Sequence, residues 1–151
     1  MSRILIFVLA GLLTGCSDRD DNNVQSSSAP SVELPNMQKN LQSKFLKAKP
    51  GDVITIPAGT FEFQRSLSLK VDGVTVRGAG MDKTILNFKN QISGAEGILV
   101  TANDFTIEDL AIEDAKGDAL KINDGKNIVI RRVRTEWTNG PDTNNGAYGI
   151  Y

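Results

Sequence analysis

The amino-acid sequence predicts an all-β fold, a solenoid of stacked parallel strands that begins with an amphipathic capping helix. The main observation is a repeat within residues 103–135, in which apolar residues recur 23 positions later, and a repeat of 22 residues overlaps it. Within each short run, apolar residues alternate with polar ones. A fixed period in the low twenties with this alternation indicates strands on successive coils. The paired positions are Phe105, Ile107 and Leu110 with Ile128, Ile130 and Val133, and Ile98 and Val100 with Leu120 and Ile122.

Length and composition narrow the classes of function. The 151 residues suit one domain, and 17 basic against 18 acidic residues give no positive surplus, so no nucleic acid partner is predicted. The sequence contains no histidine. Catalysis would therefore have to use carboxylate, lysine, arginine or tyrosine side chains. The single cysteine cannot form an internal disulfide.

The N-terminal residues predict an exported lipoprotein. Arg3 precedes the apolar run of residues 4–13, which is too short for a permanent transmembrane helix and is typical of a secretory leader. The following Leu13-Thr14-Gly15-Cys16 resembles the lipobox of bacterial lipoproteins. The resemblance implies a signal peptide at residues 1–15 and a lipid anchor to the membrane at Cys16. The alternative is an ordinary signal peptide with an incidental cysteine.

The residue after the cysteine bears on localisation. In the sorting rule that the resemblance brings, aspartate at this position favours the inner membrane, but this chain has Ser17. We therefore expect an outer-membrane lipoprotein of the bacterial cell envelope, facing the periplasm or the exterior.

Residues 16–35 predict a flexible tether. Asp, Asn and Ser dominate residues 17–31, where Val24 is the one large apolar residue. Such a stretch cannot bury enough surface to offset its chain entropy. We expect it to hold the folded part, residues 36–151, away from the membrane.

A short helix is predicted next. Apolar residues recur every three or four positions from Met37 to Ala48, with polar residues between them, and Asn36 is a suitable N-cap. Lys49-Pro50-Gly51 should end the helix, because proline cannot continue it. A helix ahead of a strand stack would cover the open core of the first coil.

The first coils follow as short β-branched or aromatic runs between Gly, Pro and Asp turns. Val74 and Val76 match Phe105 and Ile107 at a shift of 31, so this coil holds eight residues more than the next (31−23), which we expect in loops. The segment 149–151 looks like the start of a further copy. The predicted early strands are residues 53–56, 60–63, 67–69, 74–76 and 84–88.

These elements together resemble a right-handed parallel β-helix of the pectin-lyase-like superfamily. The helix, the segment 50–63, the run Asp72-Gly73-Val74-Thr75-Val76-Arg77-Gly78-Ala79-Gly80 and the later coils carry the resemblance. It implies the fold, in a superfamily of polysaccharide lyases, polygalacturonases, alginate epimerases and periplasmic accessory proteins without known sugar chemistry. The polygalacturonase motifs Asn-Thr-Asp, Asp-Asp and Gly-His-Gly and the epimerase Asp-Pro-His are absent, so the resemblance selects no reaction.

Two carboxylates are candidate catalytic residues. Glu96 and Asp118 are 22 residues apart and precede their strands by the same offset. Because neighbouring strands lie about 4.8 Å apart, the two side chains should be neighbours on one face, an arrangement used for acid and base roles in sugar chemistry. The alternative, which we favour on two residues alone, is that strand ends beside turns tolerate acidic residues.

Arginines surround the apolar positions of the last complete coil. Arg131 and Arg132 lie 23 residues after Glu108 and Asp109. Guanidinium groups in a groove, including that of Arg134, would suit a uronate chain. Opposite charges on adjacent coils also explain the pattern without a ligand, and we favour this structural role.

Aromatic residues near the end of the chain are candidate substrate-binding residues. Trp137, Tyr148 and Tyr151 surround the Asn- and Gly-rich loop 138–146, and flat amphipathic rings suit contact with sugar faces. Trp137 could equally cover the core where the coil opens. Asp142 and its neighbouring asparagines match no recognised calcium-loop spacing, so neither a metal nor a cofactor is predicted.

Two expectations complete this interpretation. Tyr151 falls inside a predicted strand with no cap after it, so we expect the N-terminal part of a longer β-helix. We also expect an envelope lipoprotein whose β-helix binds an extended polysaccharide, with cleavage or epimerisation left open. The alternative is a non-enzymatic β-helix scaffold or adhesion module.

Overall fold

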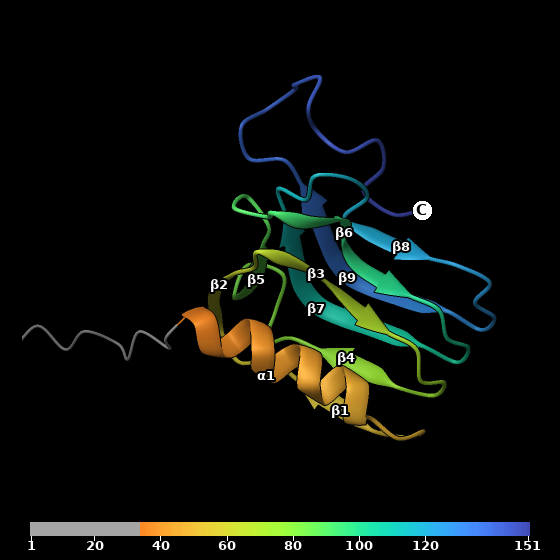
Figure 1. Cartoon of the computed structure of the whole chain (residues 1–151). Coiled ribbons are helices and arrows are strands. Elements are labelled where there is room, and N and C mark those ends of the chain that lie inside the picture. Colours follow the sequence, from red (N-terminus) through yellow and green to blue (C-terminus); the bar gives the residue numbers. More distant parts are fainter. Residues whose placement is uncertain (1–33) are drawn as a thin grey trace, which may run out of the picture. The chain divides into compact units, whose positions relative to one another are not determined.

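The structure is a computed structural model that describes residues 34–151, and it confirms an all-β parallel solenoid with one N-terminal helix (Figure 1). The predicted leader, Cys16 and residues up to 33 lie outside the described residues. No helix within residues 34–151 is long and apolar enough to cross a membrane. The elements are α1 (Leu34–Lys47), β1 (Val53–Thr55), β2 (Gly59–Glu62), β3 (Arg65–Leu69), β4 (Thr75–Arg77), β5 (Thr84–Asn87), β6 (Ser93–Val100), β7 (Thr106–Glu113), β8 (Leu120–Ile122) and β9 (Val129–Glu136).

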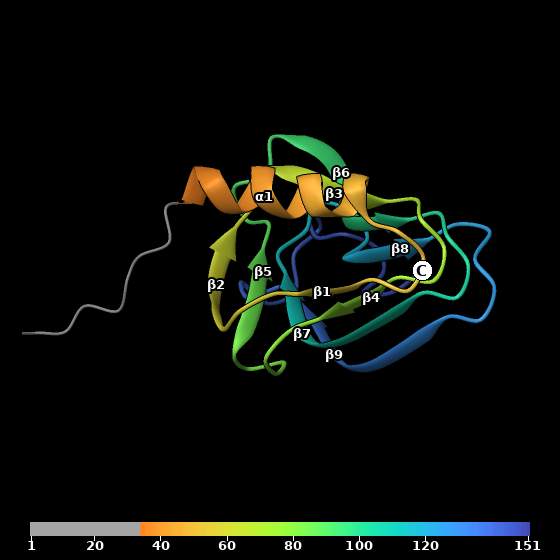
Figure 2. The same ribbon diagram turned by 90° about the horizontal axis from the view of Figure 1, so that it is seen from below.

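The strands form two parallel sheets around one core. One sheet has the order β1-β4-β7-β5-β2, with β9 added on β7, and the other has the order β3-β6-β8. Figure 2 looks along the stack, with β3, β6 and β8 on one side, β2 and β5 on another, and β1 and β4 on a third. Strands that are far apart in the sequence therefore lie side by side on each wall.

The register confirms the sequence periods. Ile107 pairs with Ile130 and Leu110 with Val133, the predicted shift of 23 residues. Ile98 pairs with Leu120 at 22. In-register stacking follows from burial, because a slip of one residue would turn the apolar side chains out of the core.

The longer coil is also confirmed, and its extra residues fall in two places. The shift between paired residues is 31 at Thr75↔Thr106, 26 at Ile85↔Ala111 and 22 at Ile98↔Leu120. The differences place five extra residues (31−26) between β4 and β5 and four (26−22) between β5 and β6. The return from β6 to β7 is one residue shorter than that from β8 to β9 (22−23), which leaves the predicted net difference of eight. The second insertion leads into β6, where the pairing register with β3 is irregular.

Helix α1 caps the first coil with its apolar side. Leu41 and Phe45 are buried in the core. The helix begins at Leu34, so the prediction of Asn36 as the N-cap is wrong: Asn36 lies in the first turn. Pro35 explains the earlier start, since a first-turn proline loses no intrahelical hydrogen bond and its φ already suits a helix.

Two glutamines of α1 pair with the free edge of β3. The Gln42 side chain donates to the Ser68 carbonyl and accepts from the Ser68 amide, both at 3.0 Å. Gln38, one helical turn earlier, accepts from the backbone amides of Gln64 and Arg65. The side-chain amides thus replace the neighbouring strand that an edge would otherwise need.

Stacked turns complete the coils. Gly73, Asp104 and Asn127 occupy one turn on three successive coils, at shifts of 31 and 23, and have φ values of 71°, 52° and 55°. Glycine, aspartate and asparagine are the residues that adopt this left-handed conformation at least cost. The Asn127 amide group also donates to Asp104 at 2.8 Å, so the turn column has its own side-chain bond.

Candidate functional site

The structure brings the candidate catalytic carboxylates onto adjacent coils. The amide of Gly97, next to Glu96, donates to the Asp118 carbonyl at 3.0 Å. Glu96 lies in the irregular part of β6, between the pairs Arg65↔Ser93 and Leu67↔Ile98. Such bulges redirect a side chain. Both carboxylates contact the same lysine side chain, that of Lys121, so they lie on one surface.

Lys121 connects the two carboxylates. Its Nζ lies 3.7 Å from Glu96 Oε1 and 3.4 Å from Asp118 Oδ2. The ammonium group offsets the repulsion between the acidic groups. Lys121 was not among the predicted site residues, although its outward position between Leu120 and Ile122, three residues after Asp118, was a signal for it.

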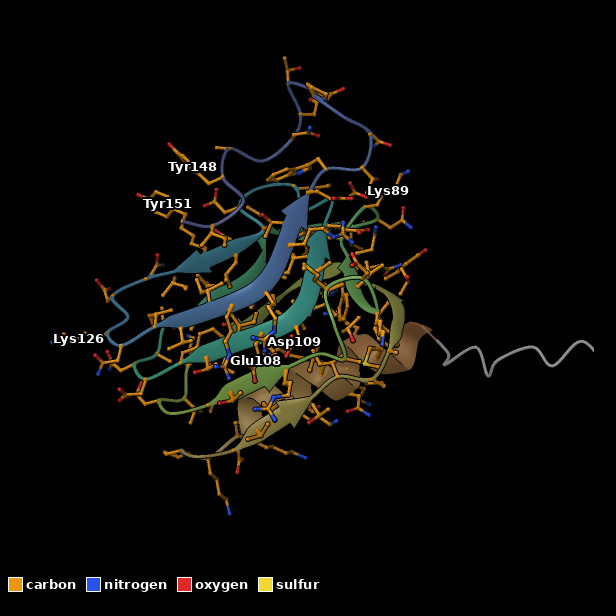
Figure 3. The ribbon with its side chains drawn as sticks, turned by 180° about the vertical axis from the view of Figure 1, so that it is seen from behind. Lys89, Glu108, Asp109, Lys126, Tyr148 and Tyr151 are labelled. Atoms are coloured by element: carbon orange, nitrogen blue, oxygen red, sulfur yellow. The ribbon has the colours of Figure 1, made fainter. Side chains whose placement is uncertain are left out.

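Two exposed tyrosines extend this surface. The ring of Tyr151 lies 5.2 Å from Lys121 Nζ, and the Tyr148 and Tyr151 ring centroids are 5.2 Å apart. Tyr148 is 54% exposed and Tyr151 is 61% exposed. Figure 3 shows both side chains close together on the C-terminal segment, which lies alongside β8. We call Glu96, Asp118, Lys121, Tyr148 and Tyr151 the tyrosine–lysine patch.

The patch spans three successive coils. Glu96 belongs to β6, Asp118 and Lys121 belong to the coil of β8, and Leu120 forms a bridge with Ile150 on the next segment. That bridge confirms that residues 149–151 start a further copy, although its shift is 30 residues (150−120) rather than 22. Polar and aromatic side chains therefore follow one another along the stack.

Trp137 takes a different position. Its indole Nε1 donates to the Ala115 carbonyl on the preceding coil at 2.7 Å. The next residue, Thr138, donates to Asp114 through its amide at 2.7 Å. These bonds fasten the start of the loop to the coil before it. The aromatic ring contact on the patch is between Tyr148 and Tyr151, and Trp137 takes no part in it.

The arginines lie on the other sheet and have the predicted partners. Arg131 Nε donates to Glu108, and Arg132 makes a paired contact with Asp109, at 2.5 and 2.9 Å. Arg77 of β4 donates to the other Glu108 oxygen at 2.5 Å. Glu108 is only 1% exposed. The hydrogen bond from Arg131, with that from Arg77, holds the pKa of Glu108 below its usual value.

Arg134 pairs with acidic residues other than Glu108 and Asp109. It contacts Glu113 at 3.0 Å, Glu136 at 2.6 Å and Asp82 at 3.7 Å. The pKa of Arg134 is raised, first by the Glu136 hydrogen bond. All three arginines thus have carboxylate partners within the protein, which accords with a structural role.

Within the described residues, no group of three His, Cys, Asp or Glu side chains is placed to hold a metal ion. Asp142 instead accepts from the amide and side chain of Asn144, at 2.8 and 2.9 Å.

A separate groove of about 470 Å³ lies between α1 and β1.

The comparisons with known proteins add no assignment: no family model, curated protein or solved structure matches this chain. Its function has to be argued from the fold and the arrangement of side chains.

Proposed function

We propose that this chain is an envelope lipoprotein whose β-solenoid binds an extended polysaccharide across the tyrosine–lysine patch. The observation that carries the proposal is the position of Lys121, which gathers Glu96, Asp118 and Tyr151 onto one surface. Tyrosine rings stack against the apolar faces of sugars, while carboxylates and ammonium groups bond to hydroxyls. A patch that runs over three coils suits a chain-like ligand better than a compact one.

The resemblance to right-handed β-helices of the pectin-lyase-like superfamily supports the choice of polysaccharide as ligand. Lys121 also favours the non-enzymatic alternative, a binding or adhesion module, because both carboxylates are already held in ion pairs. Cleavage or epimerisation instead requires Glu96 or Asp118 to exchange protons with the sugar.

Affinity electrophoresis through gels that contain polygalacturonate, alginate or a neutral glucan tests the binding proposal. We expect retardation by at least one polysaccharide, weakened about tenfold in Tyr151→Ala, as for the loss of one stacking contact. Lys121→Gln should weaken it as well. Lys126→Gln is the matched control, since this exposed lysine lies on a turn away from the patch (Figure 3). Unchanged migration of the wild-type chain in every gel would contradict the proposal.

The same samples decide between binding and turnover. If the pair is catalytic, Glu96→Gln and Asp118→Asn abolish product formation while the far-ultraviolet circular dichroism spectrum stays unchanged. Turnover that persists in both variants removes the pair from the catalytic site. Retardation without any product supports the binding module.

A further inference from the structure

Helix α1 has a basic outer surface in a chain whose net charge is −1. Residues 34–55 contain four lysines and one acidic residue, a local charge of +3 (4−1). The helix itself contains no acidic residue. The rest of the chain therefore carries a charge of −4 (−1−3), so the positive charge is concentrated at the capping end.

The exposed side of the helix combines these charges with an apolar residue. Leu46 is 71% exposed, although the helix covers a hydrophobic core in which other apolar residues of α1 are buried. Lys39 is exposed on the same side, and the exposed Lys47 follows Leu46 directly. Lysines around an outward-facing leucine are typical of helices that lie in the interface of an anionic membrane.

The groove between α1 and β1 adds hydrogen-bond donors beside this surface. Lys44 and Lys47 line it together with Asn40 and Ser43. Asp52 lines it as well, and one of its carboxylate oxygens accepts the Lys49 amide at 2.8 Å. Two ammonium groups and one carboxylate give the groove a net positive charge, which suits phosphate-bearing headgroups.

We propose that α1 is a docking surface for an anionic phospholipid bilayer. Lys39 and Lys47 contact lipid phosphates and Leu46 inserts between the headgroups, while Lys44, on the β1 side of the helix, adds positive charge at the edge of the contact. The contact is separate from the proposed anchor at Cys16, which lies 18 residues before Leu34 (34−16). One weak signal seldom fixes a protein on a membrane, but an acyl anchor and a basic helix together do.

The contact would also orient the solenoid. α1 lies beside β3, which starts the order β3-β6-β8, whereas the tyrosine–lysine patch involves β6, β8 and the segment after them. Figure 1 shows α1 at one end of the stack and the C-terminal segment toward the other. A bilayer at α1 would therefore contact the N-terminal end of the stack and leave the patch toward the opposite end.

Vesicle co-sedimentation of the chain from Ser17 onward, without leader and lipid, tests this proposal. Every residue of the buried core lies within the compact unit Val32–Tyr151, so the shortened chain retains it. We expect binding to phosphatidylglycerol vesicles, little binding to phosphatidylcholine vesicles, and release at high salt. Each lysine removed from α1 should lower the affinity about fivefold, so a Lys39→Gln, Lys44→Gln, Lys47→Gln variant should bind on the order of a hundredfold more weakly.

The matched control removes the same charge elsewhere, by Lys83→Gln, Lys89→Gln and Lys126→Gln, and should keep most of the binding. Leu46→Gln tests the apolar contribution and should weaken binding without changing its salt dependence. Equal losses in the two triple variants, or no binding by the wild-type chain, would overturn the proposal. Dimerisation in the absence of vesicles that is lost in Leu46→Gln would assign the surface to a second copy instead and would also overturn it.

Discussion

At the scale of single residues, Glu108 is the least exposed charged residue among those that the structure describes. It is buried, and it accepts hydrogen bonds from Arg77 on the coil before it and Arg131 on the coil after it. A carboxylate without these partners would be costly to bury. Its role is therefore to hold three coils together at one point.

Glu108→Gln should destabilise the fold, because it removes the negative charge between guanidinium groups. The folded-state pKa of Glu108 is lowered from 4.5. Its contribution is therefore complete above the unfolded value and is lost as the pH falls through the folded value. Urea unfolding at a series of pH values below about 5 should show a smaller loss of stability in the variant than in the wild type.

Asp124→Asn is the control for this experiment, since Asp124 is an exposed carboxylate with a positive φ that asparagine also adopts. It should leave both the urea midpoint and its pH dependence close to wild type. A Glu108→Gln variant with the pH profile of the wild type would show that the buried carboxylate contributes nothing to acid sensitivity.

Lys121 shows why the patch was only partly predictable from the sequence. Glu96 and Asp118 could be paired because their offset from the strands repeats. Lys121 looks like any outward residue of a short strand, and its partners include Tyr151, 30 residues later. A long side chain contacts whichever residues the fold places nearby, and the 22-residue period alone does not show which residues these are.

At the scale of elements, α1 covers the edge of β3 with hydrogen bonds that a neighbouring strand would otherwise make. The bonds from Gln38 and Gln42 to β3 could not be predicted from the apolar spacing, because a glutamine on a helix is usually only solvated. The cap itself could be predicted, since Leu41 and Phe45 need a core to cover. The start at Leu34 was missed because Asn36 is the better N-cap by residue type while Pro35 fits inside the first turn.

Gln42→Leu tests the edge-capping role of the helix. The variant loses two hydrogen bonds to Ser68 and should be less stable by about 2 kcal/mol, at about 1 kcal/mol for each bond. The urea midpoint measures the loss. Lys39→Gln, on the exposed side of the same helix, is the control and should change stability little. Equal midpoints for the two variants would mean that the glutamine bonds are replaced by water at no cost.

At the scale of the whole molecule, the repeat period was the most informative sequence feature. It predicted the pairing of Ile107 with Ile130 because each coil must present apolar side chains to the same interior. It could not show which loops hold the extra residues, since loops carry no such restraint. The localisation prediction concerns residues before 34 and stays a prediction.

Cys16→Ser tests the anchor. We expect the lipidated wild type to stay in the membrane pellet through a high-salt wash, because acyl chains do not respond to salt. The variant should be released by the same wash, which also removes contacts made by lysines. A variant that still needs detergent for extraction would count against lipidation at this residue.

The column Arg77–Glu108–Arg131 also has a mechanical consequence. In a stack of coils, a force on the end of the chain peels one strand at a time from its neighbour. Each step breaks a short row of backbone hydrogen bonds, but removal of β9 must also separate Arg131 and Arg132 from their carboxylates. A chain held at its N-terminal end and pulled at the other should resist most at this rung, and single-molecule extension traces should show the peak fall in Glu108→Gln.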